Sequence, residues 1–410
     1  MYGINYAPEP IGVGRYTGEL GAYLVSQNIR VDVVTAVPHY PGWVLRSGYS
    51  NRYRVEYICG ARVTRCPMFL TSEMRGLWRL FAPLSFAITS APIAVWRIFS
   101  IRPDAVFCVE PTLFCAPVAL LAAKLVGART VLHVQDLEID AAFSVGHLKS
   151  GFARNVAILI ERVVLRCFDS IVTVSKRMLE KLTEKEIPRD RLSVVRNWVD
   201  LEKIIPQSGR SKYRDELELS DEIFVALYSG NVGPKQALPL VLEAASQLEQ
   251  RKDLLFVIAG EGPEKSQLVA RYGHLSNVRF LPLQPEERLC EFLNFANVHV
   301  LPQHAGAADL VLPSKLGGML ASGKPCIVMS DAGSELHDFL STQVILTPSG
   351  DIRALAKSLV ALMDSNVIHD PKSQRQLAGE LAVGNSLSAL QNILFESAAQ
   401  PQTGRTGDDP

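Results

Sequence analysis

The sequence predicts an α/β protein with two doubly wound domains, each a parallel sheet covered by helices. Along most of the 410 residues, apolar segments without polar alternation are separated by helix-like segments. That pattern is typical of buried parallel strands. A polar stretch at 201–222, which carries Pro206 and Gly209, separates two such runs and is interpreted as a linker. The chain is long enough for two cores of ordinary size.

The composition is that of a globular protein, with 48% hydrophobic and 20% charged residues. Lys+Arg and Asp+Glu both number 42, so we expect no nucleic-acid partner. Through Asp200 there are 24 basic and 17 acidic residues, which leaves 42−24=18 basic and 42−17=25 acidic. A charge of +7 against −7 suggests that the two halves face different partners. The seven cysteines form no C-x-x-C pair, which indicates buried thiols in a reducing compartment and no zinc site.

The first domain opens on residues 1–6, which look like the second half of a buried strand whose apolar beginning is missing. We therefore expect the true start of the strand a few residues earlier. A turn containing Gly12 and Gly14 leads into a helix that ends near Ser26. Such turns are common places for backbone amides to meet phosphate, although a plain tight turn explains the glycines equally well. A strand at 31–35 follows.

An arginine-rich segment, 46–79, precedes a nearly all-apolar segment, 80–96, that contains Pro83 and Pro92. The apolar segment is too short, and too interrupted by its two prolines, to predict a membrane span. Two interpretations remain equally supported. Either it forms a buried helix pair in the domain core, or it is a monotopic surface that dips into an anionic leaflet with the arginines on headgroups.

Strands and helices then alternate through the rest of the first domain. We predict strands at 104–109, 130–134, 170–174 and 192–195, with helices at 116–126, 152–167 and 176–185. His133 and Asp136 lie where the second of these strands ends, which is where parallel sheets bind ligands. A structural histidine is the alternative.

The second domain repeats the alternation. Its predicted strands are 223–228, 254–259, 278–281, 298–301 and 326–329, and later helices are expected at 351–363 and 386–397. Three strand-to-helix loops carry ligand-type residues, at 230–235, 260–263 and 309–316. Because the carboxyl ends of parallel strands share one edge, Lys235 and Lys315 can converge on one diphosphate.

The stretch 306–325 carries the strongest candidate for an anion site. Asp309 lies in a polar loop that leads into Pro313, and Ser314 is expected to cap the following helix. Free amides at a helix start and a nearby lysine together attract anions.

Gly317 and Gly318 each cost about 1 kcal/mol inside that helix, so something must approach the backbone there. Either a tight helix contact or a nucleotide diphosphate fits. The sequence holds no Asp-x-Asp pair for a divalent metal. We therefore expect no metal and no cofactor, with lysines and amides neutralising a leaving group.

These motifs resemble the family 4 retaining glycosyltransferases of the GT-B architecture, in which two Rossmann-like domains face a central cleft. The resemblance rests on Ser229-Gly230 with Lys235, on Ala259 to Pro263, on Ala321 to Pro325, and on Asn197 to Asp200. Residues 2–6, 133–140 and 309–315 are similar to bacterial transferases of colanic-acid and related exopolysaccharide biosynthesis.

The resemblance implies an acceptor- and membrane-side domain at 1–200, to which a C-terminal helix, 384–398, crosses back. Residues 201–383 would bind the nucleotide sugar, and 399–410 would be a disordered tail. The implied reaction is a retaining, metal-independent transfer from a GDP- or UDP-linked sugar to a polyprenyl-diphosphate-linked saccharide. The protein would be cytoplasmic and peripheral on the inner, anionic face of a bacterial plasma membrane.

The resemblance also implies residue roles. His133 would contact the transferred sugar, while Lys235 and Lys315 would neutralise the departing diphosphate. Asp136 and Arg15 would lie on the acceptor side. The implied donor-binding residues are Gly12, Gly14, Gly230, Asn231, Glu261, Gly262, Leu283, Asp309, Pro313, Ser314 and Leu316.

Two departures from the family pattern concern donor recognition. Gly318 stands where the second glutamate of a Glu-x7-Glu motif holds the ribose, and Asn231 stands where many members carry an arginine. Two other functions therefore stay open: a nucleotide-sugar epimerase or dehydrogenase of similar fold, and a non-catalytic component that binds nucleotide sugar. The dehydrogenase is weakened because Gly12-Val13-Gly14-Arg15-Tyr16-Thr17 lacks the third glycine of the dinucleotide motif.

Overall fold

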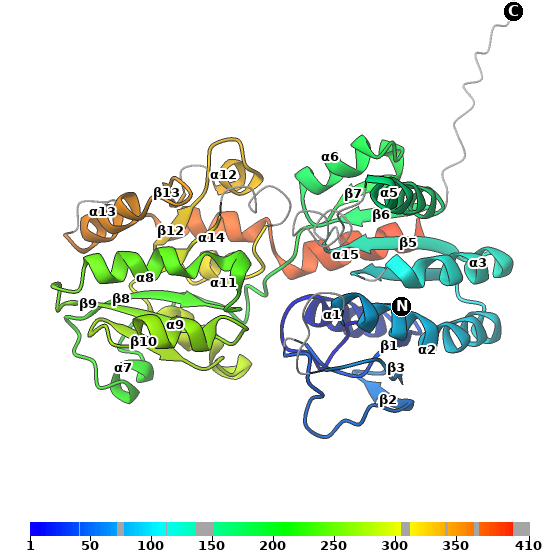
Figure 1. Cartoon of the computed structure of the whole chain (residues 1–410), viewed down its shortest axis with the longest axis horizontal. Coiled ribbons are helices and arrows are strands. Elements are labelled where there is room, and N and C mark those ends of the chain that lie inside the picture. The colour runs from blue at the N-terminus through cyan, green and yellow to red at the C-terminus, as the bar shows by residue number, and fades with distance from the viewer. Residues whose placement is uncertain are drawn as a thin grey trace, which may run out of the picture.

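The computed structural model describes residues 1–40, 42–71, 78–111, 113–136, 151–304, 312–340, 343–364 and 369–396. Within them the chain forms two α/β lobes that lie side by side, each with its own sheet (Figure 1). The predicted fold class is confirmed. The expectations for Asp309 and for the tail at 399–410 fall outside the described residues.

The N-terminal lobe is built on two sets of strands, in the orders β2-β3-β1 and β4-β5-β6-β7. Residue Tyr2 joins them, because it forms parallel bridges with Val34 on one side and with Cys108 on the other. The opening residues therefore lie in the sheet, as predicted. The strands are β1 (Asp32–Ala36), β2 (Arg54–Ile58), β3 (Ala61–Cys66), β4 (Ala105–Glu110), β5 (Arg129–Val134), β6 (Ser170–Thr173) and β7 (Leu192–Val194).

Helices cover both faces of this sheet. One face packs against α2, α3 and α6, whose apolar side chains share a core with the strands. The other face packs against α1 and against α15, which contacts β4 and β5. The helices of this lobe are α1 (Val13–Ser26), α2 (Trp78–Ile101), α3 (Ala116–Val126), α5 (Gly151–Arg166), α6 (Lys176–Glu184) and α15 (Val383–Phe395).

The prediction of a buried helix pair in the apolar segment is wrong. Residues 78–101 form one helix, α2, with Pro83 and Pro92 inside it. One face of α2, which includes Ala82, Phe86 and Ala94, is buried in the core of the lobe. That burial offsets the backbone hydrogen bonds that the two prolines remove, so the helix continues past them.

The arginine-rich segment contains an antiparallel hairpin, β2–β3, that periodicity did not reveal. Arg65 is only 1% exposed, and its guanidinium donates to a Glu56 carboxylate oxygen at 2.7 Å and to the Ala36 carbonyl at 3.2 Å. Arg62 pairs with Asp32 at 3.4 Å. The expectation that the arginines of this segment contact lipid headgroups is therefore wrong for these two, because carboxylates inside the lobe neutralise them.

The C-terminal lobe has one parallel sheet of order β10-β9-β8-β11-β12-β13. Its strands are β8 (Phe224–Ser229), β9 (Leu254–Ala259), β10 (Val278–Leu281), β11 (Val298–Leu301), β12 (Cys326–Met329) and β13 (Ile345–Thr347). Its helices are α7 (Lys212–Glu216), α8 (Leu238–Gln247), α9 (Lys265–Tyr272), α10 (Leu289–Phe295), α11 (Leu316–Ala321), α12 (Glu335–Leu340), α13 (Ile352–Met363) and α14 (Pro371–Gly379).

The linker prediction is only partly right. Within 201–222 the chain forms α7, and Tyr213 of that helix is buried. Its ring lies 4.8 Å from that of Phe292, centroid to centroid, so the segment packs on the C-terminal lobe. A single aromatic residue in a polar stretch gives no periodic signal, which is why the sequence did not show this helix.

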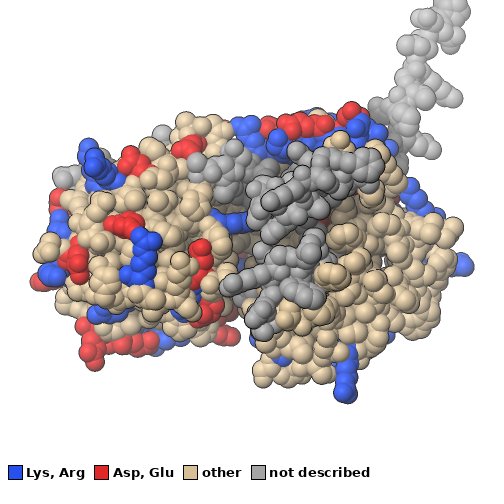
Figure 2. Space-filling model, viewed as in Figure 1, with Lys and Arg blue, Asp and Glu red and all other residues tan. Residues whose placement is uncertain are grey.

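The charge pattern differs between the lobes. Figure 2 shows Lys and Arg mixed with Asp and Glu on the C-terminal lobe, at the left of the view. The lower part of the N-terminal lobe shows a broad uncharged area instead, with basic side chains at its margin. The lobes therefore present different surfaces on this face of the molecule.

The chain passes between the lobes twice at one place. The amide of Val199 donates to the Leu381 carbonyl at 2.8 Å, and the amide of Val383 donates to the Val199 carbonyl at 3.0 Å. Helix α11 packs directly on this double crossing. A Cβ on Gly317 would lie 2.9 Å from Cβ of Val199, whereas one on Gly318 would meet only the Cδ1 atom of Leu293, at 3.1 Å. These contacts favour the tight-packing explanation for Gly317, whereas Gly318 meets only the end of a flexible side chain.

We expect Gly317→Ala to lower the free energy of unfolding and Gly318→Ala to raise it. The first adds a methyl group against the relatively fixed Cβ of Val199, and such overpacking costs about 1–3 kcal/mol of stability. The second meets the end of a flexible leucine, so the helix preference of alanine, about 1 kcal/mol over glycine, prevails. Chemical denaturation of the two variants and the wild type measures both. Equal effects would contradict the packing assignment.

Candidate active site

Two loops at the carboxyl edge of the C-terminal sheet are fastened to each other by backbone contacts. The amide of Gly230 donates to Ala259 O at 2.9 Å, and that of Val232 donates to Glu261 O at 2.9 Å. A Cβ on Gly262 would lie 2.1 Å from Val232 O, so only glycine allows this approach. The predicted loops after β8 and β9 therefore form one rigid floor.

Lys315 lies over this floor. Its Nζ atom is 4.0 Å from the ring centroid of Tyr228 and donates a hydrogen bond to the Tyr228 hydroxyl, which itself donates to Asn231 O at 2.6 Å. A Cβ on Gly230 would approach Cε of Lys315 to 3.0 Å, so that glycine makes room for the lysine. Burial lowers the pKa of Lys315 to about 7. In the described part of the chain Lys315 forms no ion pair.

The N-terminal lobe reaches this loop from across the cleft. Tyr16 on α1 lies within hydrogen-bonding reach of Ser314, while burial raises the pKa of the Tyr16 phenol to about 12. Arg15 donates to Glu19 at 2.8 Å and lies within electrostatic reach of Glu286 in the other lobe. Two predicted residues from different domains, Arg15 and Ser314, thus lie on facing sides of the cleft.

A second bridge across the cleft joins Lys235 and Asp136. Lys235 Nζ lies 3.5 Å from Asp136 Oδ2, and the lysine side chain is 67% exposed. Lys235 comes from the short 3₁₀ helix Pro234–Gln236 after β8, and Asp136 follows β5. An exposed pair of this kind contributes little to stability, so Lys235 can exchange partners at low cost.

His133, in β5, is buried near the carboxyl end of the N-terminal sheet. Its ring nitrogens lie 3.2 and 3.5 Å from Nε2 of Gln135, and its ring is 5.6 Å from that of Phe107. Burial lowers the pKa of His133 to about 4, so the imidazole is neutral at physiological pH. A neutral ring can donate or accept a hydrogen bond without carrying charge.

The predicted glycines of the first loop contact their own lobe. Gly12 stands before α1 with φ of 66°, and a Cβ there would meet the Tyr40 ring at 3.1 Å. A Cβ on Gly14 would lie 2.4 Å from Oε2 of Glu9. Glu9 is a buried carboxylate that accepts from the amides of His39 and Tyr40, at 3.1 and 3.0 Å. Packing on Glu9 thus explains Gly14.

At the start of α11, Ser314 was expected to cap the helix and the amides were expected to be free. The structure differs on the cap and on one of the amides. The helix begins after Lys315, and no side-chain hydrogen bond from Ser314 caps it. The amide of Leu316 donates to Pro313 O at 2.9 Å, so it is already occupied. The turn closes on itself and directs the Leu316 side chain into the core.

Glu261 pairs with Lys265 at 2.7 Å, and Leu283 is half-buried in the loop after β10.

The sequence did not single out Tyr228 or Tyr16, and it pointed to Trp198 only as part of the motif Asn197 to Asp200. Tyr228 supports Lys315, and Tyr16 reaches Ser314 while its ring packs edge-on against Trp198 at 5.0 Å. All three occupy apolar positions of the pattern, where a buried aromatic residue and a functional one look the same. The one signal available was the tyrosine that ends the strand before Ser229-Gly230.

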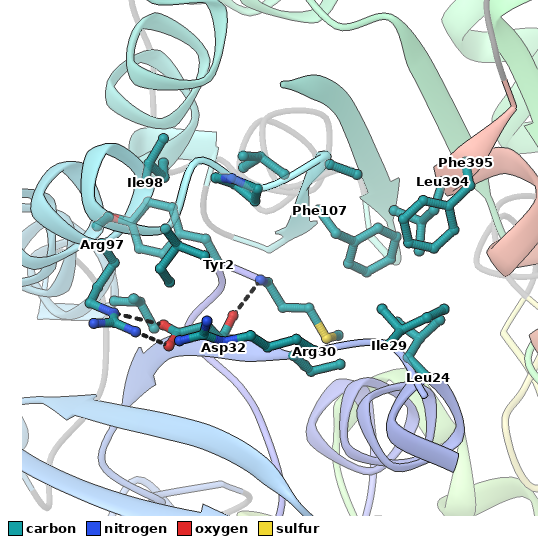
Figure 3. Close-up of a pocket in the computed structure, with 18 residues that line it drawn as sticks. Tyr2, Leu24, Ile29, Arg30, Asp32, Arg97, Ile98, Phe107, Leu394 and Phe395 are labelled. Atoms are coloured by element: carbon teal, nitrogen blue, oxygen red, sulfur yellow. Dashed lines mark hydrogen bonds and ion pairs between the residues drawn. The ribbon is translucent and has the colours of Figure 1, made fainter. Parts of the chain in front are cut away.

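A separate cavity of about 110 Å³ lies in the N-terminal lobe (Figure 3). It is lined mainly by apolar side chains, among them Tyr2, Ile98 and Phe107, and Asp32 on its floor pairs with Arg97. The cavity lies where β1 and β4 begin. Ligands of parallel sheets bind at the opposite, carboxyl ends, so this cavity is not the candidate site.

The arrangement suits a dianionic group placed between the lobes. Lys315 supplies a charge from the floor, Lys235 supplies one from the rim, and Arg15 faces them from α1. The glycines of the two loops let the loops pack on each other and let Lys315 lie over them. Among the described residues there is no cluster of three His, Cys, Asp or Glu side chains suited to a metal ion.

Comparisons with known proteins agree with this geometry. A family model described as "Glycosyl transferase 4-like domain" matches residues 12–198, and one described as "Glycosyl transferases group 1" matches residues 223–365. The chain is 39% identical over 351 residues to the putative colanic acid biosynthesis glycosyl transferase WcaI of Escherichia coli K12, covering 83% of this chain and 85% of the relative.

The chain is also similar to a more distant glycosyltransferase and to a solved structure. The chain is 25% identical over 258 residues to the Escherichia coli UDP-Gal:alpha-D-GlcNAc-diphosphoundecaprenol alpha-1,3-galactosyltransferase, covering 61% of this chain and 64% of that protein. Among solved structures it superposes on Anabaena HepE in complex with UDP and glucose, with a TM-score of 0.68 and 13% identity, covering 96% of this chain and 98% of the other. That likeness shows the fold.

We expect Lys315 to titrate near pH 7 in the ligand-free protein, because burial disfavours its charged form. Adding inorganic pyrophosphate should raise that pKa, since an anion beside the lysine stabilises the ammonium. NMR titration of protein with ¹³C-labelled lysine measures both values, and the signal lost in Lys315→Met assigns the resonance. A Lys315 signal that titrates at the ordinary value of about 10.4, with or without pyrophosphate, would contradict the site.

Proposed function

The chain belongs to the family 4-like glycosyltransferases of the GT-B fold, and from that premise we propose a specific reaction for it. The donor is a GDP- or UDP-linked hexose or deoxyhexose. The acceptor is a polyprenyl-diphosphate-linked saccharide of bacterial exopolysaccharide biosynthesis. The transfer is metal-independent and retains the anomeric configuration.

The observation that carries the proposal is the position of Lys315. Its ammonium is held over Tyr228 and against Gly230, in surroundings that lower its pKa to about 7. Lys315 is half-buried and has no carboxylate partner among the described residues, which is costly unless a ligand supplies the counter-charge. The diphosphate of a nucleotide sugar would supply it. Gly230 and Gly262 serve this arrangement indirectly, because Gly230 makes room for Lys315 and Gly262 lets the two loops pack together beneath it.

Lys235 would provide the second charge. Without donor it lies beside Asp136, and we propose that the diphosphate replaces that carboxylate as its partner. Charge builds on the leaving phosphate as the glycosidic bond breaks, so two cations at that position lower the barrier. Release of Asp136 at the same moment leaves a carboxylate on the acceptor side of the cleft.

In the proposed step the acceptor hydroxyl attacks the anomeric carbon from the face that the phosphate leaves. The bond between that carbon and the phosphate oxygen breaks, and the phosphate oxygen takes the proton of the hydroxyl. His133, neutral because its pKa is lowered to about 4, would hydrogen-bond the transferred sugar. Arg15 would contact the acceptor from α1.

The relatives support the choice of acceptor. The name of one includes a diphosphoundecaprenol-linked sugar as acceptor, and another belongs by its name to colanic acid biosynthesis. A lipid-linked acceptor would place this enzyme in the cytoplasm, peripheral on the inner face of the plasma membrane. The proposed donor carries guanine or uracil. Its ribose is held without the usual carboxylate, because Gly318 stands in that place.

A screen of GDP- and UDP-sugars by thermal shift tests the donor, since a bound ligand raises the melting temperature by mass action. The sugar that stabilises the protein is then incubated with a lipid extract that contains polyprenyl-diphosphate saccharides, in the presence of EDTA. A lengthened glycolipid with the donor's anomeric configuration is expected. An isomerised donor without transfer would assign an epimerase instead, and binding without turnover would assign a non-catalytic component.

We expect Lys235→Ala and Lys315→Ala each to lower turnover about a hundredfold or more, as loss of one charge-stabilising donor does. Initial rates at saturating donor measure the effect. Lys252→Ala provides the control, because Lys252 is an exposed lysine bonded to Glu249 and Ser276. Wild-type rates in both site variants would remove the two lysines from the mechanism.

A further inference from the structure

Helix α2 presents an apolar stripe to the outside of the protein. Between Phe81 and Phe99 its exposed positions recur at three- and four-residue spacing and are apolar: Phe81, Leu84, Ile88, Pro92, Trp96 and Phe99. Ser100, next to the end of the helix, is exposed and polar. At 1.5 Å per residue the stripe is about 27 Å long. Surface helices of globular proteins normally carry polar side chains on this face. Ile88, at 67% exposed, shows how fully the stripe is open to solvent.

The neighbouring helix α3 extends the apolar stripe sideways. It packs against α2 and exposes Leu121, at 64%, and Leu125. On α5, Leu159 and Val163 are also exposed. In the C-terminal half, by contrast, the exposed large apolar side chains of the described residues are Ile205, Val269 and Phe395, which are far apart in sequence. A patch of this extent marks an interaction surface.

The charges around the stripe select the kind of partner. Neither α2 nor α3 contains an acidic residue. Lys124 on α3 and Arg102 just after α2 are exposed, and in the described part of the chain neither has an ion-pair partner. In Figure 2 the uncharged lower part of this lobe has only basic side chains at its margin. A second copy of the chain would bring like charges together, whereas an anionic bilayer complements them.

We propose that the apolar stripe, with Leu121 and Leu125 of α3, docks flat on an anionic lipid bilayer. The apolar side chains enter the boundary between headgroups and acyl chains, and Lys124 and Arg102 contact the headgroups. This inference rests on the proposed function only in that a lipid-linked acceptor gives the docking a purpose. The surface itself is independent of the reaction.

The structure also explains why α2 is long and apolar enough to pass for a membrane span. By length and composition alone, the segment Phe81–Ile101 is long enough and apolar enough to cross a bilayer. However, the face opposite the stripe, at Phe86, Ser90 and Ala94, is buried in the lobe, and Ser90 hydrogen-bonds to Tyr2 at 2.7 Å. A helix fixed to a sheet in this way cannot cross a bilayer. It is apolar on both faces because one packs on protein and the other on lipid.

The direction of α2 relates this surface to the cleft. The helix leads from the end of β3 to the start of β4, so it runs opposite to these strands. Its first turns therefore lie towards the carboxyl edge of the sheet, where His133 and Asp136 are found. Docking along the stripe places that edge within reach of a lipid-linked substrate.

Flotation of the full chain with vesicles of equal parts phosphatidylcholine and phosphatidylglycerol, at low salt and without donor, tests the proposal. We expect the wild type to float with the vesicles. Ile88→Glu and Leu121→Glu should each lower the partition coefficient about tenfold or more. Each removes an apolar side chain that would enter the bilayer and adds a negative charge that the anionic lipids repel. Val269→Glu is the matched control, an exposed valine on α9 of the other lobe, and should float like the wild type.

Lys124→Glu tests the electrostatic contribution to vesicle binding separately from the apolar one. It should weaken binding to the anionic vesicles while leaving the weaker binding to pure phosphatidylcholine unchanged. A wild type that stays in the soluble fraction overturns the proposal. So does a wild-type dimer that Ile88→Glu converts to a monomer, because the stripe would then bind a second copy. Donor-induced thermal shift should be unchanged in Ile88→Glu, so failure of docking is distinguishable from failure of the proposed reaction.

Discussion

The contact between Gly317 and Val199 is the constraint on which the rest of the candidate site depends. Val199 belongs to the double crossing between the lobes, held by its two hydrogen bonds to Leu381 and Val383. Because Gly317 has no side chain, α11 lies directly on this crossing. That position brings Lys315 over the loops after β8 and β9, and brings Ser314 within hydrogen-bonding reach of Tyr16. A larger residue at 317 would displace the loop from both lobes together.

The two lysines of the site differ in environment, and this divides their work. Lys315 is enclosed by Tyr228 and Gly230, so burial lowers its pKa to about 7 and makes it dependent on an anionic ligand. Lys235 is exposed and has Asp136 beside it, so its charge is always compensated. One residue is thus fixed before the ligand arrives, and the other must change partner. Fixed charges cost no reorganisation during a reaction, which favours Lys315 as the stronger contributor.

The N-terminal lobe combines two surfaces of opposite character. Its cleft edge is polar, with His133, Asp136 and Arg15, whereas the outer face of α2 and α3 is apolar with a basic margin. Both arise from one sheet, because parallel strands place their carboxyl ends at one edge and the crossover helices over the faces. Arginines in the hairpin β2–β3 serve neither surface. Arg62 and Arg65 neutralise carboxylates inside the lobe.

The sequence alone determined the strands and most helices, because buried parallel strands and their crossover helices have strong local patterns. Strands β9 to β12 and helix α3 have the predicted bounds. It also indicated the family, both lysines and His133. Tertiary structure decided what local pattern cannot show: that α2 continues through two prolines, that Tyr213 anchors a helix in the linker, and that Glu9 explains Gly14. It decided, too, that Lys315 is half-buried while Lys235 is exposed, since that depends on Tyr228, 87 residues away from Lys315 in the chain.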